Sequence, residues 1–473
     1  MKIAFVQNLM MPYFGISYIS SVLRKGGHLS EVFIEGLHKD IVKDICDAQP
    51  DIVGFYCITG EHRWVERTAR EIKKKLDIPV IVGGPHPTYF PEMVEEDGID
   101  MICRGDGEIA VLELMNRIER KENTNNIEGI WSKEGVDIHK NGVGEMIEDL
   151  ETLPLPDRDL YDKYDFFKEE TEIPVCVSRG CPFNCTFCYN ASKKKLYLGK
   201  KVVRTRSVEN IMSEITYLRK EYPLMKSIIF NDDNLGLSPD WFNEFCEKYA
   251  GINGPPYFAS IRADFINEKT IKKLKKSNCF CLSLGVESGS AEMRRKILHK
   301  NIPDEVYINA AKLMRENGIK VRTSNMFFLP GETIDMAFKT VWLNKKMKTD
   351  YPWVYPLQPY PGTEIYDYSM KNNFLRKDFS FDDIDPLGIL ESPLESKLKD
   401  GKKIKVLHRL FYYGVKVPGF VYLLKLFVYI PNNFVFEFFH RFAILMTYAN
   451  YHQVSFYRAL KVALQANKVE KRK

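Results

Sequence analysis

A loop with three closely spaced cysteines constrains this chain more than any other feature of its sequence. Cys181, Cys185 and Cys188 are spaced C-x3-C-x2-C and directly follow an apolar run that predicts a short buried strand. Gly180 and Pro182 favour a sharp turn after that strand and exclude a regular helix through the first cysteine. A tight loop of this kind can aim three thiolates at one point.

The spacing favours an iron–sulfur cluster over a zinc site. Such clusters are held by cysteine thiolates, usually four, so three close ligands predict a cluster with one iron left open. Zinc sites favour paired cysteines with a second Cys/His pair downstream, and no such pair follows near this loop. A chance grouping of three among the ten cysteines is the remaining alternative.

Length and cysteine usage indicate several domains in a reducing compartment. A chain of 473 residues is too long for one hydrophobic core. The cysteines show no disulfide-like framework, and the N-terminus begins with a strand pattern rather than a signal peptide, so we expect a cytoplasmic protein. No uncharged apolar run reaches the ~20 residues that span a bilayer.

Charge is unevenly distributed along the chain. The net charge is +5, but residues 401–473 carry 13 Lys/Arg and two Asp/Glu, a net +11, which leaves a net −6 on the first 400 residues. The C-terminus is therefore a basic module on a mildly acidic body.

The first 145 residues alternate strand and helix patterns, which predicts a doubly wound parallel sheet of the Rossmann-like type. Ligands of such sheets lie beyond the carboxyl ends of the strands, where Gly83, Gly84 and Gly105 fall. Glycines there allow a close approach to a bulky ligand, or they simply form tight turns. The expected strands are residues 3–7, 29–34, 51–56, 79–82 and 101–103.

A second strand–helix series follows a proline-spaced segment. We interpret residues 146–171 as a linker and residues 172–385 as a partial (β/α)6 barrel that carries the cysteine loop after its first strand. Polar residues recur where its strands end, as in the active sites of βα-barrels. These residues are Asp232, Asp233, Asn234, Arg262, Glu287, Gly331 and Glu332.

The cysteine loop and these strand ends resemble the signatures of the radical S-adenosylmethionine (SAM) superfamily. In that family the aromatic before the third cysteine, here Phe187, belongs to the loop pattern. The resemblance implies a [4Fe–4S] cluster on the three cysteines and SAM contacts at Phe187 and at the seven strand-end residues. Each of those residues considered alone could instead be a helix cap or a salt-bridge partner.

The first 145 residues resemble the cobalamin-binding domain that precedes many radical SAM domains. The sequence lacks the D-x-H-x-x-G motif of classical cobalamin enzymes, so the lower axial ligand is open, and His86 is expected as a pocket wall rather than a ligand. The resemblance rests on residues 13–17, 50–54 with Thr59, 82–86 and 104–108. It implies cobalamin contacts from Gly15, Ser17, Thr59, Gly83, Gly84, His86, Gly105 and Glu108.

Residues 386–473 form the predicted helical, basic and aromatic C-terminal module. We expect a helical cap packed over the barrel. The alternative is an interfacial surface that contacts anionic lipid at the inner face of the membrane, because basic residues are interleaved with aromatics. Nucleic-acid binding ranks third and is not expected, since no recognition-helix or stacking-sheet motif is present.

The resemblance implies a cobalamin-dependent radical SAM enzyme that methylates an unactivated carbon of a small-molecule or lipid-like substrate. It also implies an external electron donor of the flavodoxin or ferredoxin type. The alternatives are a cyclase or oxidative rearrangement enzyme of the anaerobic chlorophyll cyclase type, and a non-catalytic iron–sulfur electron carrier or regulator.

Overall fold

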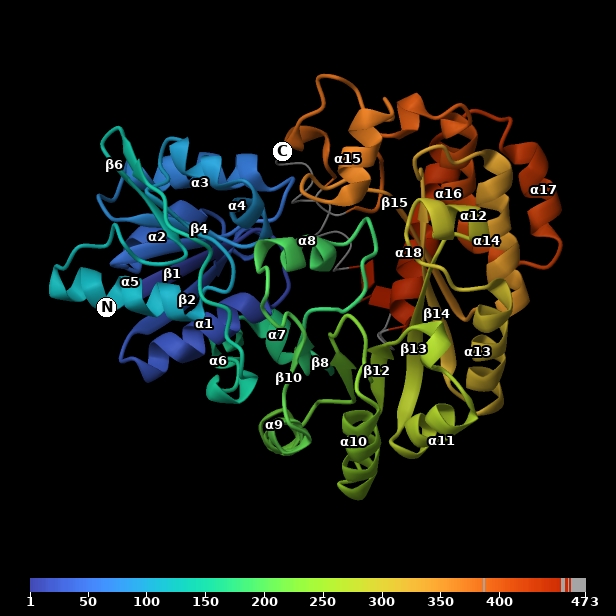
Figure 1. Ribbon diagram of the computed structural model, residues 1–473, viewed down its shortest axis with the longest axis horizontal. Helices are drawn as coiled ribbons and strands as arrows, with labels where there is room; N and C mark the ends of the chain where they lie inside the picture. The colour runs from blue at the N-terminus through green and yellow to red at the C-terminus, as the bar shows by residue number, and fades with distance from the viewer. Residues whose placement is uncertain (386–387, 452–455, 458, 461–473) are drawn as a thin grey trace. The chain divides into compact units, whose positions relative to one another are not determined.

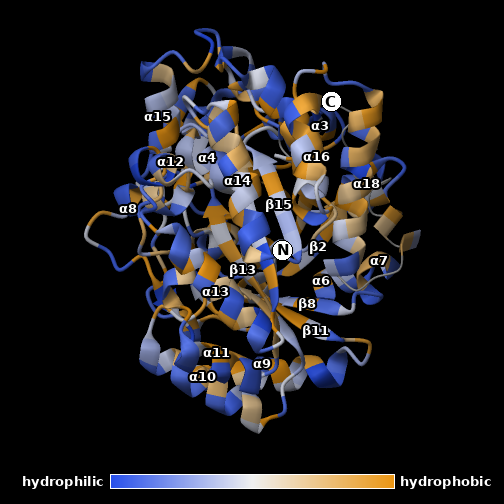
Figure 2. Cartoon of the chain, turned by 90° about the vertical axis from the view of Figure 1, so that its right-hand side faces the viewer, coloured by the Kyte–Doolittle hydropathy of each residue, from blue (hydrophilic) through white to orange (hydrophobic). Residues whose placement is uncertain are grey.

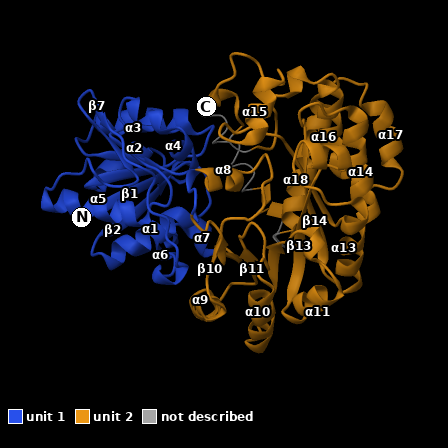
Figure 3. Cartoon of the chain, viewed as in Figure 1, with its two compact units in different colours: residues 1–169, 196–199, 461–473 blue, residues 170–195, 200–460 orange. Residues whose placement is uncertain are grey.

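The computed structural model describes residues 1–385, 388–451, 456–457 and 459–460. The described chain forms two compact units (Figures 1 and 3). Unit 1 comprises residues 1–169 and 196–199, and unit 2 comprises residues 170–195 and 200–460.

Unit 1 contains a seven-stranded sheet in the order β2-β1-β3-β4-β5-β6-β7. The first five strands are parallel, which confirms the predicted doubly wound sheet, and β6 and β7 add an antiparallel edge. In the order 2-1-3-4-5 the ligand crevice lies at the carboxyl ends of β1 and β3, where the connections diverge. The strands are β1 (Lys2–Gln7), β2 (Leu29–Ile34), β3 (Ile52–Tyr56), β4 (Val80–Gly83), β5 (Met101–Cys103), β6 (Ile130–Glu134) and β7 (Asp137–His139).

Helices cover both faces of this sheet because its strands are apolar on both faces. Ile3 and Phe5 of β1 pack in one core with α1 and α5, whereas Ala4 and Val6 pack in a second core with α2 and α3. This alternation follows the two-residue period of a strand. The helices are α1 (Phe14–Lys25), α2 (Ile41–Asp47), α3 (His62–Lys73), the short α4 (Pro85–Tyr89) and α5 (Glu108–Arg120).

Most of the segment predicted as a linker packs within unit 1. Buried Asp157 accepts a hydrogen bond from Ser20 Oγ at 2.6 Å and pairs with Arg24 at 2.7 Å, so it holds the segment to α1. Tyr161 donates its hydroxyl to Gln7 Oε1 at 2.8 Å, at the end of β1. Asp157 lies just before the short helix α6 (Asp159–Asp162), Tyr161 lies within it, and the short helix α7 (Asp165–Lys168) follows.

Unit 2 is an open, six-stranded parallel sheet in the order β8-β11-β12-β13-β14-β15, with strands in chain order and helices between them (Figure 1). This confirms the predicted partial barrel. Ser207 caps α9 by accepting the Asn210 N–H at 3.1 Å, as its position before the helix predicts. The strands are β8 (Glu172–Val175), β11 (Ser227–Phe230), β12 (Tyr257–Ser260), β13 (Cys279–Glu287), β14 (Lys320–Phe327) and β15 (Tyr351–Pro356). The main helices are α9 (Val208–Glu221), α10 (Pro239–Gly251), α11 (Glu268–Lys276), α13 (Asp304–Glu316) and α14 (Ile334–Met347).

The described part of the C-terminal module is helical and packs on this sheet. Leu407 and Phe411 of α16 share a core with Phe327 of β14 and Val341 of α14, so α16 caps the barrel as expected. In the part of the chain that the structure describes, no helix is long and apolar enough to cross a membrane. The module's helices are α16 (Gly401–Lys416), α17 (Phe420–Phe427) and α18 (Phe434–Tyr451); its residues 386–387, 452–455, 458 and 461–473 lie outside the described residues.

Candidate functional site

The cysteine loop leaves the barrel beyond β8, between the short strand β9 (Ser178–Arg179) and α8 (Tyr189–Leu196). Gly180 has φ +88, and a Cβ there would overlap the carbonyl oxygen of Val202, so only glycine fits the turn. Lys194 of α8 donates to Phe183 O at 2.9 Å and to Asn184 Oδ1 at 2.7 Å. These bonds hold the loop against α8, the helix that follows it.

All three loop cysteines are free, half-buried thiols. Cys185 interacts electrostatically with both Cys181 and Cys188. Burial raises the pKa of each thiol, to about 11 for Cys188, whose sulfur also accepts the Asn190 amide at 3.7 Å. Metal binding therefore has to displace the thiol protons.

Three thiolates in one loop are a donor set that fits an iron–sulfur cluster with one open iron. No group of three His, Cys, Asp or Glu side chains among the described residues is placed to hold one metal ion. N–H groups directed at the sulfurs are also typical of cluster loops, where they tune the potential.

Thr186 anchors the loop from the position between the second and third cysteines. Its side chain is buried, Oγ1 donates to Ile297 O at 2.6 Å, and its N–H donates to Leu298 O at 3.3 Å. Phe187 packs against the core that α16 shares with the barrel. The sequence pattern includes Phe187 but gives no signal for the role of Thr186.

The three polar residues after β11 have different surroundings. Asp232 is buried, and its carboxylate accepts the Val177 N–H at 3.1 Å and the Ser178 hydroxyl at 2.6 Å, so it fixes the end of β8. Burial raises the Asp232 pKa to about 6 despite these bonds. Asp233 is exposed and lies near Cys181 and Cys188, and Asn190 hydrogen-bonds to its carboxylate.

Asn234 and Arg262 join the ends of β11 and β12. Asn234 is buried and accepts the Arg262 N–H at 2.9 Å, while its own Nδ2 has no hydrogen-bond partner. The Arg262 guanidinium binds both oxygens of Asp264 at 3.1 and 2.7 Å and lies 3.6 Å from the ring centre of Phe183 in the cysteine loop. An unpaired buried amide donor fits a polar ligand at these strand ends.

Glu287, at the end of β13, forms a buried ion pair that the sequence does not reveal. Lys300 Nζ donates to Glu287 Oε1 at 3.0 Å, and the side chains are 8% and 11% exposed. Gly285 leaves space for the pair, because a Cβ there would overlap Glu287 Oε1 and lie 2.7 Å from Lys300 Nζ. Lys300 and Glu287 also interact electrostatically with Cys185, so the pair lies beside the cysteine loop.

Glu332 turns back on the end of β14. It is 2% exposed, its Oε2 accepts the Leu329 N–H at 3.2 Å, and its Oε1 has no partner. Burial raises its pKa to about 8, so the carboxyl is mostly neutral at pH 7. Gly331, with φ +78, provides the turn before it.

In unit 1, two of the predicted glycines, Gly83 and Gly84, lie where β4 ends. Gly84 has φ +106, and a Cβ there would lie 2.7 Å from Cys57 O, so a side chain is excluded. Gly83 is less constrained, since its Cβ would make ordinary contact with Cys103 at 3.7 Å. Gly15, in the first turn of α1, has open space where a side chain would stand.

Thr59 and His86 form a buried polar pair next to these glycines. Thr59 Oγ1 and His86 Nδ1 are 3.1 Å apart, and His86 stacks on His62 with ring centres 5.0 Å apart. Burial, together with His62, lowers the His86 pKa to about 3, so the imidazole is neutral at pH 7. A neutral, hydrogen-bonded imidazole is consistent with the expected role as a pocket wall.

The remaining predicted cobalamin residues are divided between α1 and the turn after β5. Ser17 is buried in α1, and Glu108 is buried in the first turn of α5. Gly105 has φ +90, and a Cβ there would overlap the Tyr197 hydroxyl, which donates to Gly144 O at 3.1 Å. The space beside Gly105 is therefore occupied by Tyr197.

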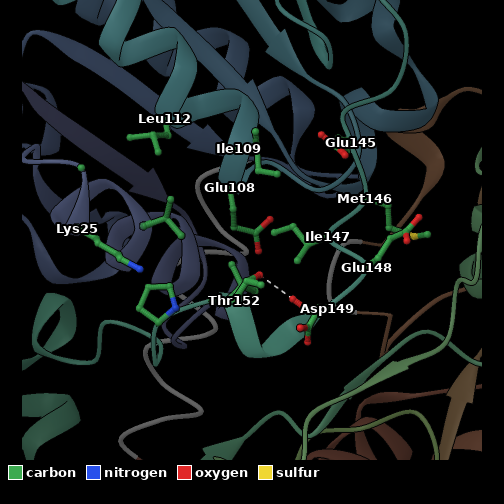
Figure 4. Close-up of a pocket in the computed structure, with 14 residues that line it drawn as sticks. Lys25, Glu108, Ile109, Leu112, Glu145, Met146, Ile147, Glu148, Asp149 and Thr152 are labelled. Atoms are coloured by element: carbon green, nitrogen blue, oxygen red, sulfur yellow. Dashed lines mark hydrogen bonds between the residues drawn. The ribbon is translucent and has the colours of Figure 1, made fainter.

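A cavity of about 590 Å³ in unit 1 is formed by α1, the start of α5 and residues 145–154 (Figure 4). Of the predicted cobalamin residues it includes only Glu108, beside Ile109 and Leu112. Thr152 donates to Asp149 O at 2.7 Å in its wall. This cavity is therefore not formed by the strand-end residues described above.

Comparison with known proteins places these features in one family. A model of the radical SAM superfamily matches residues 175–341, and a model of the B12-binding domain matches residues 6–115. An uncharacterized methyltransferase of Pyrococcus horikoshii is 31% identical over 77% of this chain and 80% of its own length. The anaerobic magnesium-protoporphyrin IX monomethyl ester cyclase of Rubrivivax gelatinosus is 26% identical over 74% of this chain and 65% of its own length.

The fold agrees with a solved structure of the same kind. The radical SAM methyltransferase TsrM of Kitasatospora setae, solved with cobalamin and a [4Fe–4S] cluster bound, superposes with a TM-score of 0.65 at 16% identity, over 78% of this chain and 75% of that one. The three cofactors expected from the sequence are those of this family. The chain therefore belongs to the cobalamin-dependent enzymes of the radical SAM superfamily, with a B12-binding domain before the barrel.

Proposed function

We propose that this enzyme transfers a methyl group from SAM, by way of cobalamin, to a carbon atom of a small or hydrophobic substrate. The observation that carries the proposal is the 31% identity, over four-fifths of its length, with a relative named as a methyltransferase. Cyclisation is the second candidate, favoured by the cyclase relatives at 24–26% identity.

When bound, the cluster and SAM supply a carbon-centred radical, and cobalamin supplies a methyl carrier. We assign Cys181, Cys185 and Cys188 to the cluster. Thr186 fixes the loop to the 297–298 segment, and Asp232 fixes its entry from β8. These side chains are built into the fold, so the loop needs little rearrangement to bind the cluster.

The strand ends of unit 2 would hold SAM. Asp233 has its carboxylate near two loop cysteines, which suits the amino group of SAM. The unpaired Nδ2 of Asn234 offers a hydrogen-bond donor, and Glu287, oriented by Lys300, offers a carboxylate acceptor. The other proposed SAM contacts are Phe187, Arg262, Gly331 and Glu332; Asp232 acts through the loop backbone.

The carboxyl edge of the unit 1 sheet would hold cobalamin. Gly84 and Gly105 provide the positive-φ turns that follow β4 and β5, and His86 presents a neutral wall rather than a metal ligand. The other proposed contacts are Gly15, Ser17, Thr59, Gly83 and Glu108. The electron has to come from an external donor, for which we propose a flavodoxin or ferredoxin.

Product analysis tests methylation against cyclisation. The reconstituted enzyme is incubated without oxygen with methyl-deuterated SAM, a reductant and fractionated small-molecule and lipid extracts. Methylation predicts S-adenosylhomocysteine and deoxyadenosine in equal amounts, and a product that carries the deuterated methyl group. Substrate-dependent deoxyadenosine without S-adenosylhomocysteine would contradict methylation and favour cyclisation.

A further inference from the structure

The helices α17 and α18 carry a surface of exposed apolar side chains in unit 2. Between residues 422 and 442, ten large apolar side chains are each at least 40% exposed, out of 20 at that level among the described residues. The most exposed of these ten is Phe434, at 84%. We call this set the aromatic surface: Tyr422, Leu423, Leu426, Tyr429, Ile430, Phe434, Val435, Phe438, Phe439 and Phe442.

The exposed residues follow helical spacing on both helices. Tyr422 and Leu426 are one turn apart on α17, and Phe434, Phe438 and Phe442 are each one turn apart on α18. Hydrophobic residues recur along α18 in Figure 2. Surfaces of this kind are uncommon on soluble monomers and mark sites of interaction.

The opposite faces of α17 and α18 are buried in the hydrophobic core of unit 2. Val421 and Leu424 of α17 and Phe436 of α18 are buried in the core shared with the barrel. Phe427 packs on Phe436 with ring centres 6.1 Å apart and so links the two helices. Apolar side chains thus face in both directions, and the inner face alone accounts for the packing of the cap.

Exposed positive charge accompanies the aromatic surface. Residues 401–451 contain seven Lys/Arg and one acid, Glu437. Lys403 and Lys405 pair with acids that precede this range, namely Asp400, Glu391 and Glu395. That acid accepts a hydrogen bond from Arg409 Nε at 2.7 Å, so its charge is compensated. Lys425 and Arg441 are exposed on the same two helices, and the Lys403 ammonium lies 4.8 Å from the ring centre of Tyr429.

We infer that α17 and α18 dock on the surface of an anionic lipid bilayer. Exposed aromatic and leucine side chains insert at the boundary between headgroups and acyl chains, while Lys and Arg pair with anionic headgroups. A symmetric contact between two copies would bring two surfaces of the same positive charge together, which is unfavourable. The inference holds whichever reaction the enzyme catalyses.

The test is sedimentation of the full-length protein with vesicles of mixed phosphatidylglycerol and phosphatidylcholine, and with vesicles of phosphatidylcholine alone. We expect binding to the anionic vesicles that weakens as salt is added. Replacing both exposed cations, Lys425→Gln with Arg441→Gln, should lower the partition coefficient ~25-fold, at about fivefold per cation.

A matched pair of variants distinguishes insertion of the aromatic surface from nonspecific hydrophobic adsorption. Leu426→Ser/Phe434→Ser removes two side chains of the aromatic surface that are 66% and 84% exposed, and should lower binding at least ~tenfold. The control Val136→Ser/Leu198→Ser removes two apolar side chains of unit 1 that are 96% and 83% exposed, and it should leave binding unchanged. Equal binding by the two variants, or no binding to anionic vesicles, would overturn the inference. Dimers of the wild-type protein that only the first variant dissociates, without vesicle binding, would assign the surface to a second copy instead.

Discussion

Lys300→Met tests the buried ion pair beside the cysteine loop. The ammonium lies 3.0 Å from Glu287 Oε1, and both side chains are almost fully buried. Burial lowers the pKa of Lys300, but the charge of Glu287 outweighs it, so the net shift is upward and the lysine is charged. Removing it leaves the Glu287 carboxylate buried without its cation, which costs ~3–5 kcal/mol.

Two controls distinguish this effect from a general loss of charge. Lys296→Met breaks the Lys296–Glu292 pair, which is 2.7 Å long but more than half exposed, and should cost less than ~0.5 kcal/mol. The double change Lys300→Met/Glu287→Gln removes both buried charges and should recover most of the loss.

Native-state hydrogen exchange of peptides from β13 measures the opening free energy of this part of unit 2 directly. A loss for Lys300→Met as small as that for Lys296→Met would show that the buried pair does not stabilise this part of unit 2. So would a double variant no more stable than the single one, because the cost would then not come from an unpaired Glu287.

Three further predictions concern the proposed sites. The pKa of Glu332 is raised from 4.5 to about 8, so the folded protein binds more protons than the unfolded chain between these pH values. As the pH rises through this range, the stability of the wild type should fall by ~1.4 kcal/mol per pH unit relative to Glu332→Gln. Urea unfolding measures this difference. His86 has a lowered pKa, so wild-type stability should fall relative to His86→Gln as the pH decreases from 6.5 towards 3, and parallel pH profiles would contradict this. Gly105→Ala should be more destabilising in thermal unfolding than Gly27→Ala. Both positions have positive φ (+90 and +87), but only the Cβ at residue 105 would meet a neighbour, the Tyr197 hydroxyl. Equal losses of stability would show that backbone strain alone matters.

Local signals in the sequence predict both sheets and the position of the cysteine loop. Apolar runs that end in glycine or polar residues identify β1 to β5 of unit 1, and the Ser207 cap identifies the start of α9. Gly180 and Pro182 predict the turn after β8 because their conformational limits act within a few residues. The antiparallel strands β6 and β7 are missing from the prediction, since their short, polar sequences resemble loops.

The partners of the predicted site residues could not be derived from sequence, because they depend on tertiary contacts. Lys300 follows a run rich in Arg and Lys, which is typical of an exposed helix, yet it is buried beside Glu287. Asp232 matches a ligand pattern, but its carboxylate accepts the Val177 N–H just after the end of β8. The segment around Asp157 has the composition of a linker, yet it packs on α1 through the buried Asp157 carboxylate, which bonds to Ser20 and Arg24.

Anaerobic reconstitution with iron, sulfide, cobalamin and SAM tests whether Cys181, Cys185 and Cys188 hold a cluster that cleaves SAM. Deoxyadenosine is measured by mass spectrometry after addition of a reductant. We expect the wild-type protein to retain about four irons per chain and bound corrin and to cleave SAM, as one open-iron [4Fe–4S] cluster requires. A triple Ala variant of the three cysteines should retain the corrin, hold no cluster and form no deoxyadenosine. A triple variant that still binds a full cluster, or a cluster-loaded wild-type protein that never cleaves SAM, would show that the three cysteines do not form a radical SAM site.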